Sequence, residues 1–200
     1  MLEIGNAQSY FARLSQTVHR LPFETIDRCG DLLLDAYDNG RMIYLFGNGG
    51  SAALASHFAC DLAKGTINGS KKRFRVLALT DNVPLMTAWA NDSRYEDIFA
   101  EQLANFVHKD DIAFAISGSG NSRNVLNALM LAREAKATTI GLVGYQGGKM
   151  KDLCDVCVIV PSDSMQVIED LHLCVAHALF SAIHRKLAAA DLSKFASQGR

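Results

Sequence analysis

One stretch of this sequence decides its fold, and it reads Phe114-Ala-Ile-Ser-Gly-Ser-Gly-Asn-Ser-Arg-Asn124. Its first residues are an apolar strand candidate, its middle is a loop of small hydroxyl and glycine residues, and helix formers follow. A helix that begins near Asn121 directs unpaired N–H groups and the positive end of its dipole into the space beside the loop. The stretch therefore predicts a phosphate-binding turn between a strand and a helix.

The loop has the side chains and the backbone freedom that a phosphate site needs. Ser117, Ser119 and Ser122 offer hydroxyls, and glycines such as Gly118 let the backbone N–H groups come close to a ligand. No lysine follows at Walker-A spacing, so a nucleoside triphosphate held with Mg²⁺ is not favoured and no nucleotide cofactor is expected. A helix cap without a ligand is the alternative interpretation of this loop taken alone.

A second unit of the same kind lies about seventy residues earlier. The apolar residues 42–46 run into Gly47-Asn-Gly-Gly-Ser51, and a helix is predicted at 51–64. In a parallel sheet both loops lie at the carboxyl ends of strands, which is where open α/β sheets bind ligands. Two such loops facing one crevice indicate a binding site.

Apolar strands alternate with helices along the whole chain, which implies a parallel sheet covered on both faces. The predicted strands are 42–46, 75–79, 112–116, 138–143 and 156–160. The predicted helices are 3–20, 23–39, 51–64, 83–90, 94–107, 121–135 and 166–187. We expect one α/β domain over 1–200, a three-layer α/β/α sandwich with a five-stranded parallel sheet, in which residues 1–40 form an N-terminal helical extension.

The composition excludes several classes of protein. A hydrophobic fraction of 49% and a charged fraction of 20% are ordinary for a globular domain. A net charge of −1 gives no general attraction to nucleic acid or to an anionic membrane, and no apolar run approaches about 20 residues. The N-terminus lacks the parts of a signal peptide, and five irregularly placed cysteines fit a reducing cytoplasm. We expect a cytoplasmic protein with neither nucleic acid nor membrane as a partner.

Cys154 and Cys157 have the spacing of a redox or metal-binding pair. No second pair completes a zinc site, so we interpret them as small core residues beside a strand.

His57 and Asp61 stand four residues apart on the predicted helix 51–64, so both side chains lie on one face of it. That geometry suits two ligands of a divalent metal, or a paired acid and base. A surface pair is the alternative, but this helix begins at the 47–51 loop and its first turns border the predicted pocket.

The predicted helix 166–187 is almost wholly apolar apart from Glu169, Asp170, His172 and His177. Burying ionisable groups there is costly unless they are paired or bind a metal. Asp170 and His177 share a face closely, whereas Glu169 and His177 diverge by about 80°. Periodicity does not choose between the two acids, and a solvated polar stripe is the alternative.

Six segments occur in one order along the chain and cover nearly all of it: Gly47-Asn-Gly-Gly-Ser51, His57 four before an acid, Ala90-Asn-Asp92, Ile116-Ser-Gly-Ser-Gly-Asn-Ser122, Gly144-x-x-Gly-Gly148 and Glu169-Asp-x-His-x-x-x-x-His177. Together they resemble the sugar isomerase (SIS) domain family, whose sheet is flavodoxin-like, and within it the phosphoheptose isomerases. The two Ser/Gly loops are specific to the SIS fold, and the two-histidine pattern points to the heptose branch.

This resemblance implies a homotetrameric enzyme of heptose biosynthesis that converts sedoheptulose 7-phosphate into glycero-manno-heptose 7-phosphate, with an enediol between them. The positions that match phosphate-binding residues are Ser117, Gly118, Ser119 and Ser122. Those that match sugar-binding residues are Asn48, Gly49, Gly50, Ser51, Asn91, Asp92 and Glu169. The positions that match a zinc-binding quartet, one Zn²⁺ per subunit, are His57, Asp61, Glu169 and His177, and in it Asp61 and His177 match the catalytic proton-transfer pair.

The sequence departs from the family pattern at three positions. Asp61 stands where the family usually has Glu, Glu169 where it has Gln, and Gln166 where it has an acid. Aspartate is one methylene shorter than glutamate, so a base at 61 would reach less far into the pocket. Glu169 would make the metal site more anionic, which would strengthen metal binding or mark another sugar phosphate as the substrate.

Two other classes of function stay open. A non-catalytic SIS relative would bind a sugar phosphate or a replication-initiator protein, and the presence of both His57 and His177 argues against it. A dinucleotide-dependent oxidoreductase is suggested by Gly47, Gly49 and Ala52, which satisfy G-x-G-x-x-A. No acid follows about twenty residues later at the end of a second strand, and Asp81 comes too late.

The N-terminal segment carries apolar side chains that a second subunit would cover, namely Ile4, Phe11, Leu14, Leu21 and Phe23. Closed symmetry makes a dimer the minimum, and the family resemblance implies a homotetramer. A neighbouring chain would then contribute to each site, with His184, Arg185 and the surroundings of Lys64 as candidates.

Overall fold

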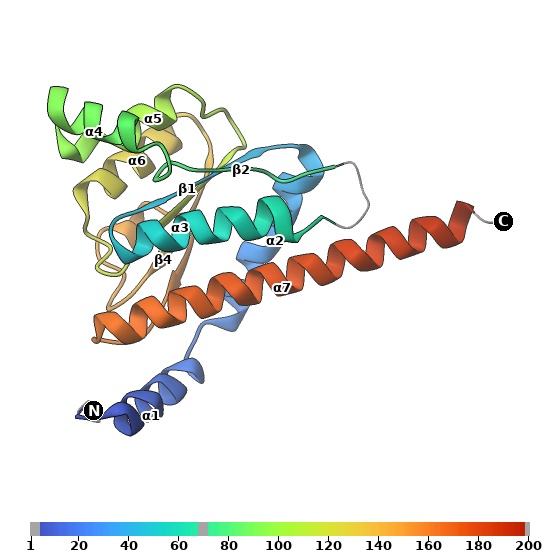
Figure 1. Cartoon of the computed structure of the whole chain (residues 1–200), viewed down its shortest axis with the longest axis horizontal. Helices are drawn as coiled ribbons and strands as arrows, with labels where there is room; N and C mark the ends of the chain where they lie inside the picture. The colour runs from blue at the N-terminus through green and yellow to red at the C-terminus, as the bar shows by residue number, and fades with distance from the viewer. Residues whose placement is uncertain (1–4, 68–71, 199–200) are drawn as a thin grey trace.

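The computed structural model describes residues 5–67 and 72–198, with side chains as far as residue 190. Its sheet is parallel throughout and has the order β2-β1-β3-β4-β5, the doubly wound order of flavodoxin-like folds. Figure 1 shows β2 beside β1 in this sheet. The strands are β1 Met42–Gly47, β2 Arg75–Ala78, β3 Ile112–Ser117, β4 Thr138–Val143 and β5 Val156–Ile159. The predicted α/β/α sandwich with a five-stranded parallel sheet is confirmed.

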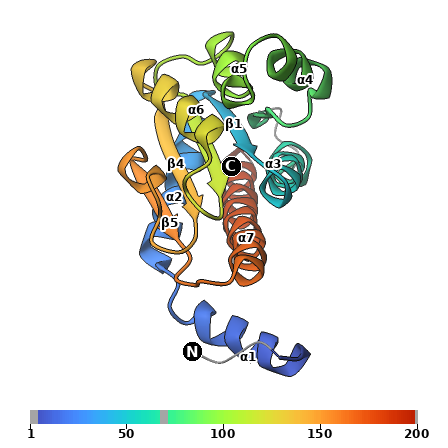
Figure 2. The ribbon, with the colours of Figure 1, turned by 90° about the vertical axis from the view of Figure 1, so that its left-hand side faces the viewer.

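The strands alternate their side chains between two hydrophobic cores, one on each face of the sheet. On β1, Ile43 and Leu45 join the core under α2 (Phe23–Asn39), α3 (Gly50–Cys60) and α7 (Met165–Gln198). Tyr44 and Phe46 join the opposite core, under α5 (Ala100–Ala104) and α6 (Arg123–Glu134). Figure 2 shows α3 and α7 beside each other against the sheet. Their contact brings the two predicted histidine helices together.

Most element positions agree with the predictions, and the helix 23–39 has the predicted bounds. The helix predicted at 3–20 is α1, Ala7–Val18, which begins where the Asn6 side chain accepts a hydrogen bond from the Ser9 N–H. Residues 1–4, and with them Ile4, lie outside the described residues. The last helix continues past the predicted residue 187, because no glycine or proline interrupts the chain before Gly199.

Two predicted helices are divided. The helix predicted at 51–64 becomes α3 followed by a π-helical turn, η1 Asp61–Gly65. The prediction of one continuous helix over 94–107 is wrong, because a 3-10 turn, η2 Tyr95–Asp97, precedes the short α5. Asp97 causes this break, because it binds the Arg94 side chain and accepts from Ser93. The remaining elements are α4 Val83–Asp92 and the 3-10 turn η3 Met150–Asp152.

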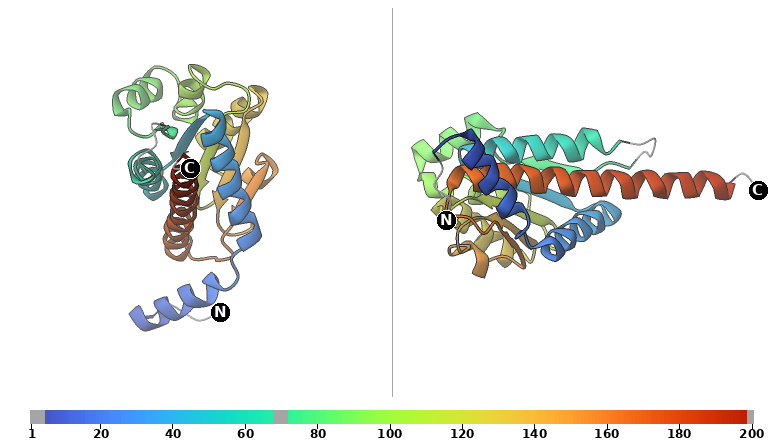
Figure 3. Two further views of the ribbon diagram at one scale, coloured as in Figure 1. Left: turned by 90° about the vertical axis from the view of Figure 1, so that its right-hand side faces the viewer. Right: turned by 90° about the horizontal axis from the view of Figure 1, so that it is seen from below.

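The N-terminal segment divides into two parts. α2 packs in the core through Cys29 and Leu33 and contacts both β5 and α7. α1 lies apart from the sheet and crosses the first part of α7 (Figure 3). The Tyr10 hydroxyl donates to Asp170, and Arg13 pairs with Asp163. Leu14 packs against the core and Leu21 is buried in it, so these two side chains are covered within the chain and the expectation that a second subunit covers them was wrong.

α7 is long and apolar enough over Met165–Ala190 to cross a membrane by length and composition alone. It is also the central helix of one core, to which it contributes Val167, Leu171, Val175 and Leu179. Core helices of soluble proteins pass the same test, so the hydropathy of α7 follows from its packing against the sheet.

Candidate active site

Three side chains from two helices meet at one point. His57 Nε2, near the end of α3, lies 3.1 Å from His177 Nε2 on α7. Asp61 Oδ2 lies 3.3 Å from His57 Nε2 and 3.9 Å from His177 Nε2. Asp61 begins the π-helical turn η1, and single π turns inside helices occur frequently at functional sites.

The arrangement of these three atoms fits a divalent cation. Asp61 Oδ2 is buried and has no hydrogen-bond partner in the described part of the chain, although a buried anionic oxygen needs one. Around zinc with bonds of 2.0–2.1 Å, tetrahedral ligand atoms lie about 3.3 Å apart, close to the distances among these atoms. Two imidazole nitrogens and one carboxylate oxygen are also a zinc donor set. His57, Asp61 and His177 therefore form a candidate metal site.

Helical periodicity does not choose between Glu169 and Asp170 as the acid of the site, but the two side chains have different neighbours in the structure. A Cβ built on Gly50 would lie 3.1 Å from both carboxylate oxygens of Glu169, so this carboxylate lies against the first turn of α3. Asp170 instead accepts the Tyr10 hydroxyl. Glu169 thus borders the 47–51 loop, and the described residues that form the candidate metal group are His57, Asp61 and His177 without it. The structure brings together three of the four residues predicted to bind zinc.

The Ser/Gly loop after β3 is closely packed around its glycines. Ser117 is buried, and its Oγ accepts from the Gly120 N–H at 3.2 Å and lies 3.4 Å from Ser122 Oγ. Ser119 Oγ accepts from the Asn121 N–H. α6 begins just after Ser122, whose side chain caps none of its N–H groups. The Val125 N–H is taken by Asn124 Oδ1, but for the Arg123 and Asn124 N–H groups no acceptor is recorded among the described residues, so the start of this twelve-residue helix can receive an anion beside three serine hydroxyls.

The Gly144–Gly148 loop after β4 packs against the serine loop, residues 117–122. Gly120 has φ +65°, and a Cβ there would lie 2.3 Å from the Gly147 carbonyl oxygen, so only glycine fits. The Met150 N–H donates to the Gly120 carbonyl, and the Lys149 N–H donates to Asn121 Oδ1. The glycine motif at 144–148 thus shapes the serine loop by close backbone contact.

The loop after β1 joins the same region. Gly49 has φ +54°, and Ser51 is buried in the first turn of α3. Asn48 exchanges two hydrogen bonds with Asn124 and accepts a third from Tyr95. Asn124 and Tyr95 were not predicted as site residues. The sequence offered one signal that Asn124 belongs to the site, namely its position two residues after Ser122 at the end of the stretch 114–124.

Asn91 and Asp92 lie at the end of α4 and are both exposed. Asn91 donates to the Asp92 carboxylate at 2.7 Å. Within the described residues, neither has a recorded hydrogen bond to a predicted site residue outside this pair, so their assignment to the sugar stays a prediction.

Known proteins resemble this chain over most of its length. The model of the SIS domain family matches residues 8–144. The phosphoheptose isomerase of Aliarcobacter butzleri is 37% identical over 180 residues, 90% of this chain and 93% of that protein. The chain belongs to the phosphoheptose isomerase family. A second member of that family, from Helicobacter pylori, is 39% identical over 165 residues, 82% of this chain and 85% of that protein.

A solved phosphoheptose isomerase structure has the same fold. The structure from Neisseria gonorrhoeae superposes with a TM-score of 0.81 at 31% identity, over 88% of this chain and 95% of that chain. Membership in the phosphoheptose isomerase family sets aside the oxidoreductase interpretation of Gly47, Gly49 and Ala52.

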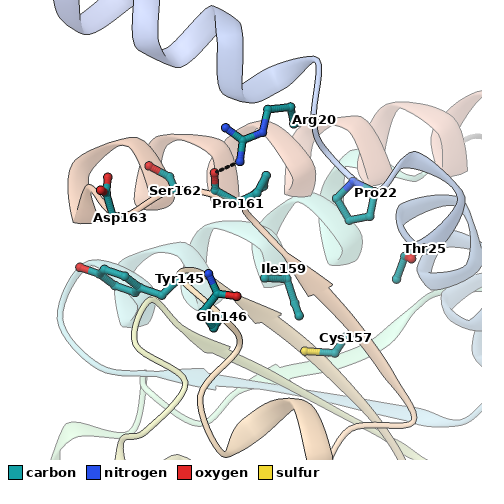
Figure 4. A pocket seen from close by; sticks show the side chains of 10 residues that line it. All are labelled: Arg20, Pro22, Thr25, Tyr145, Gln146, Cys157, Ile159, Pro161, Ser162 and Asp163. Carbon is teal, nitrogen blue, oxygen red and sulfur yellow. Dashed lines mark hydrogen bonds between the residues drawn. The ribbon is translucent and has the colours of Figure 1, made fainter. Parts of the chain in front are cut away.

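A cavity of about 690 Å³ lies away from the site residues of this phosphoheptose isomerase family member. It opens where the chain after β4 and β5 meets the α1–α2 link, and Tyr145, Ser162 and Arg20 line it (Figure 4). Arg20 donates to the Pro161 carbonyl at 3.1 Å. None of its lining residues belongs to the serine loop or to the histidine cluster, so this cavity is separate from the predicted site.

Proposed function

We propose that this protein is the aldose–ketose isomerase that converts sedoheptulose 7-phosphate into glycero-manno-heptose 7-phosphate, a step of heptose biosynthesis. Its membership in the phosphoheptose isomerase family supports this activity. The observation that carries the proposal is the meeting of His57, Asp61 and His177 on two packed helices that border ligand loops. The serine loop would bind the phosphate and so anchor the sugar away from its reacting carbons.

The reaction moves a proton between C1 and C2 through an enediol. One member of the Asp61/His177 pair would remove the proton from carbon, and the other would help to move a proton between the two oxygens. Asp61 has two carboxylate oxygens, so it can face the histidines through Oδ2 and still offer Oδ1 to the substrate. The closeness of the two groups supports this pairing.

His57, Asp61 and His177 would hold one Zn²⁺ per subunit, and a substrate oxygen, water or Glu169 after a side-chain movement would complete the coordination. Bound there, the ion would polarise the carbonyl and stabilise the charge of the enediolate. Asp61 Oδ2 supports this assignment, because it is buried beside the two histidines and has no hydrogen-bond partner among the described residues.

Glu169 would contact the sugar from the first turn of α3. Its carboxylate already lies against Gly50, in the loop that we assign to the substrate. An anionic group at this place favours hydrogen-bond donors, such as sugar hydroxyls, and repels phosphate, which would keep the phosphate at the serine loop.

A homotetramer in the cytoplasm is the assembly and location that we propose. The exposed aromatic side chains of Phe11 and Phe23 support an association through the N-terminal extension, residues 1–40. Phe11 lies on α1, which contacts the rest of the chain mainly along α7.

The decisive experiment is to incubate the purified protein with a panel of phosphorylated ketoses and to identify the products by NMR. Conversion of sedoheptulose 7-phosphate with exchange of one carbon-bound proton for solvent deuterium is the expected result. A protein that binds sugar phosphates but turns over none of them would contradict the proposal and favour the non-catalytic alternative.

A further inference from the structure

A reciprocal pair of side-chain hydrogen bonds joins the two predicted ligand loops. Asn48, in the loop after β1, donates from Nδ2 to Asn124 Oδ1 at 2.9 Å. Asn124, in the first turn of α6, donates from Nδ2 to Asn48 Oδ1 at 2.8 Å. Because each amide gives one hydrogen and accepts one, both bonds form only when the two groups face in matching directions, so the orientation of one amide sets that of the other.

Asn124 is itself held in place. Its side chain is 2% exposed, and its Oδ1 also accepts the Val125 N–H at 2.9 Å. Another rotamer would leave buried polar atoms unpaired, which is unfavourable. The rigid partner in the pair is therefore Asn124, and the half-buried Asn48 is the side chain that it orients.

Tyr95 adds a third bond, since its hydroxyl donates to Asn48 Oδ1 at 3.0 Å. The turn that carries Tyr95 is held by α6 as well, because Asn127 Nδ2 donates to the Glu96 carbonyl at 3.0 Å. One helix thus fixes Asn48 directly through Asn124 and indirectly through the turn at 95–97.

These bonds leave Asn48 with one unused hydrogen-bonding group. Its oxygen has two lone pairs, which accept from Asn124 and Tyr95, and one of its two N–H bonds goes to Asn124. For the second N–H, no acceptor is recorded among residues 5–67 and 72–190. An oriented side chain with a single free donor is suited to bind one oxygen of a ligand.

We propose that Asn124 is a positioning residue, assisted by Tyr95, which orients Asn48 so that it presents one N–H donor to an oxygen of the sugar phosphate. The inference rests on the proposed isomerase function and deepens it. It also couples the position of the loop after β1 to that of the serine loop, because Asn124 lies two residues after Ser122, where the serine loop ends.

The kinetic test is a double-mutant cycle on sedoheptulose 7-phosphate with Asn48→Ala, Asn124→Ala and both together. Each single variant should lose about 10- to 100-fold in kcat/KM, as expected when a substrate-orienting group is misplaced. The double variant should be within about threefold of Asn48→Ala, because Asn124 acts only through Asn48. Losses that multiply, or an Asn124→Ala variant as active as the parent, would overturn the proposal.

Tyr95→Phe covers the case in which Asn124→Ala does not fold, since Tyr95 is exposed. It removes one neutral hydrogen bond and should lower kcat/KM by about three- to tenfold with an unchanged melting temperature. Asn105→Ala is the matched control, because Asn105 is an exposed asparagine whose side chain, among the described residues, is recorded to bond the Glu101 carbonyl alone. It should behave as the parent.

A second readout does not depend on the reaction. The side-chain amide signals of Asn48 in ¹⁵N–¹H NMR spectra should move toward the values of a solvated asparagine in Asn124→Ala, and by less in Tyr95→Phe. Unchanged Asn48 signals in both variants would overturn the positioning role. If the parent turns over no sedoheptulose 7-phosphate, the proposed function fails, and these signals still decide the inference.

Discussion

His57 Nε2 and His177 Nε2 lie 3.1 Å apart although 120 residues separate them in the sequence. The contact arises because α3 and α7 pack together on one face of the sheet, each with a histidine on the facing side. Asp61 lies one turn after His57 and completes the cluster. Two histidines and a carboxylate this close are stabilised most simply by a cation between them.

The first prediction concerns this metal. Protein purified without chelator should contain about one divalent ion per chain, with zinc as the expected element. His57→Ala and His177→Ala should each lower the content severalfold, whereas His19→Ala, at an exposed histidine of the α1–α2 link, should not. Elemental analysis of the four proteins measures this. Equal metal content in all of them would exclude the cluster as the binding site.

The second prediction concerns the phosphate. Ser119→Ala and Ser122→Ala together should raise KM for a sugar phosphate sharply, because each charge-assisted hydrogen bond contributes roughly 1.5–3 kcal/mol. Ser181→Ala, at an exposed serine of α7, is the control and should leave KM unchanged. Steady-state kinetics, with calorimetry for binding, provide the comparison. The phosphate assignment is wrong if the double variant binds as tightly as the parent.

The third prediction distinguishes two costs of placing a side chain at Gly120. One is the strain of its positive φ, and the other is the close contact of the added Cβ with Gly147. Gly120 and Gly40 both have φ +65°, but a Cβ would lie 2.3 Å from the Gly147 carbonyl oxygen at Gly120 and would meet nothing within 4 Å at Gly40. Gly40→Ala should therefore cost only about 1–2 kcal/mol of unfolding free energy. Gly120→Ala should cost more and should also weaken phosphate binding. Denaturant titrations that give equal losses would show that the contact with Gly147 is unimportant.

The fourth prediction concerns acid stability. Burial lowers the pKa of His172 to about 4 from its usual 6.5, and the nearby Val143 backbone opposes this shift only in part. The unfolded chain therefore binds the proton more tightly, so stability is fully present above pH 6.5 and is lost as pH falls from 6.5 toward 4. The loss should reach about 3 kcal/mol, at about 1.4 kcal/mol per pKa unit.

The difference between the parent and His172→Leu isolates this effect. The variant should lose less stability between pH 6.5 and 4 than the parent when both unfold at one protein concentration. His19→Leu should follow the parent. If His172→Leu and the parent have parallel pH profiles, the buried imidazole does not cause the acid sensitivity.

The fifth prediction concerns assembly. Light scattering at micromolar concentration should give about four times the chain mass of 21.8 kDa. Phe11→Asp should shift the protein toward smaller species, since Phe11 is 64% exposed on α1 and an apolar side chain there needs a cover. Phe106→Asp, at a comparably exposed aromatic after α5, is the control. A stable monomer of the parent would contradict the tetramer.

The sequence by itself determined the layers and the two tight loops that follow β1 and β3. Local signals suffice for these features, because a buried parallel strand reads as an apolar run and a tight turn against a phosphate demands glycine and small hydroxyl residues. The conformation of the stretch 114–124 could therefore be predicted from its own residues. The observed element bounds differ from the predicted ones mainly where side-chain hydrogen bonds interrupt a helix. Asp97 is such a case, since its bonds to Arg94 and Ser93 divide the helix predicted at 94–107.

Only the tertiary structure decided which distant side chains meet. Periodicity left Glu169 and Asp170 open, because neighbours on a helix differ by about 100° and both directions were compatible with a site. The packing of α7 between α1 and α3 separates them: Asp170 accepts the Tyr10 hydroxyl, and Glu169 lies against Gly50. The pairing of Asn48 with Asn124 was equally invisible in the sequence, because a contact between two loops depends on how their strands lie beside each other in the sheet.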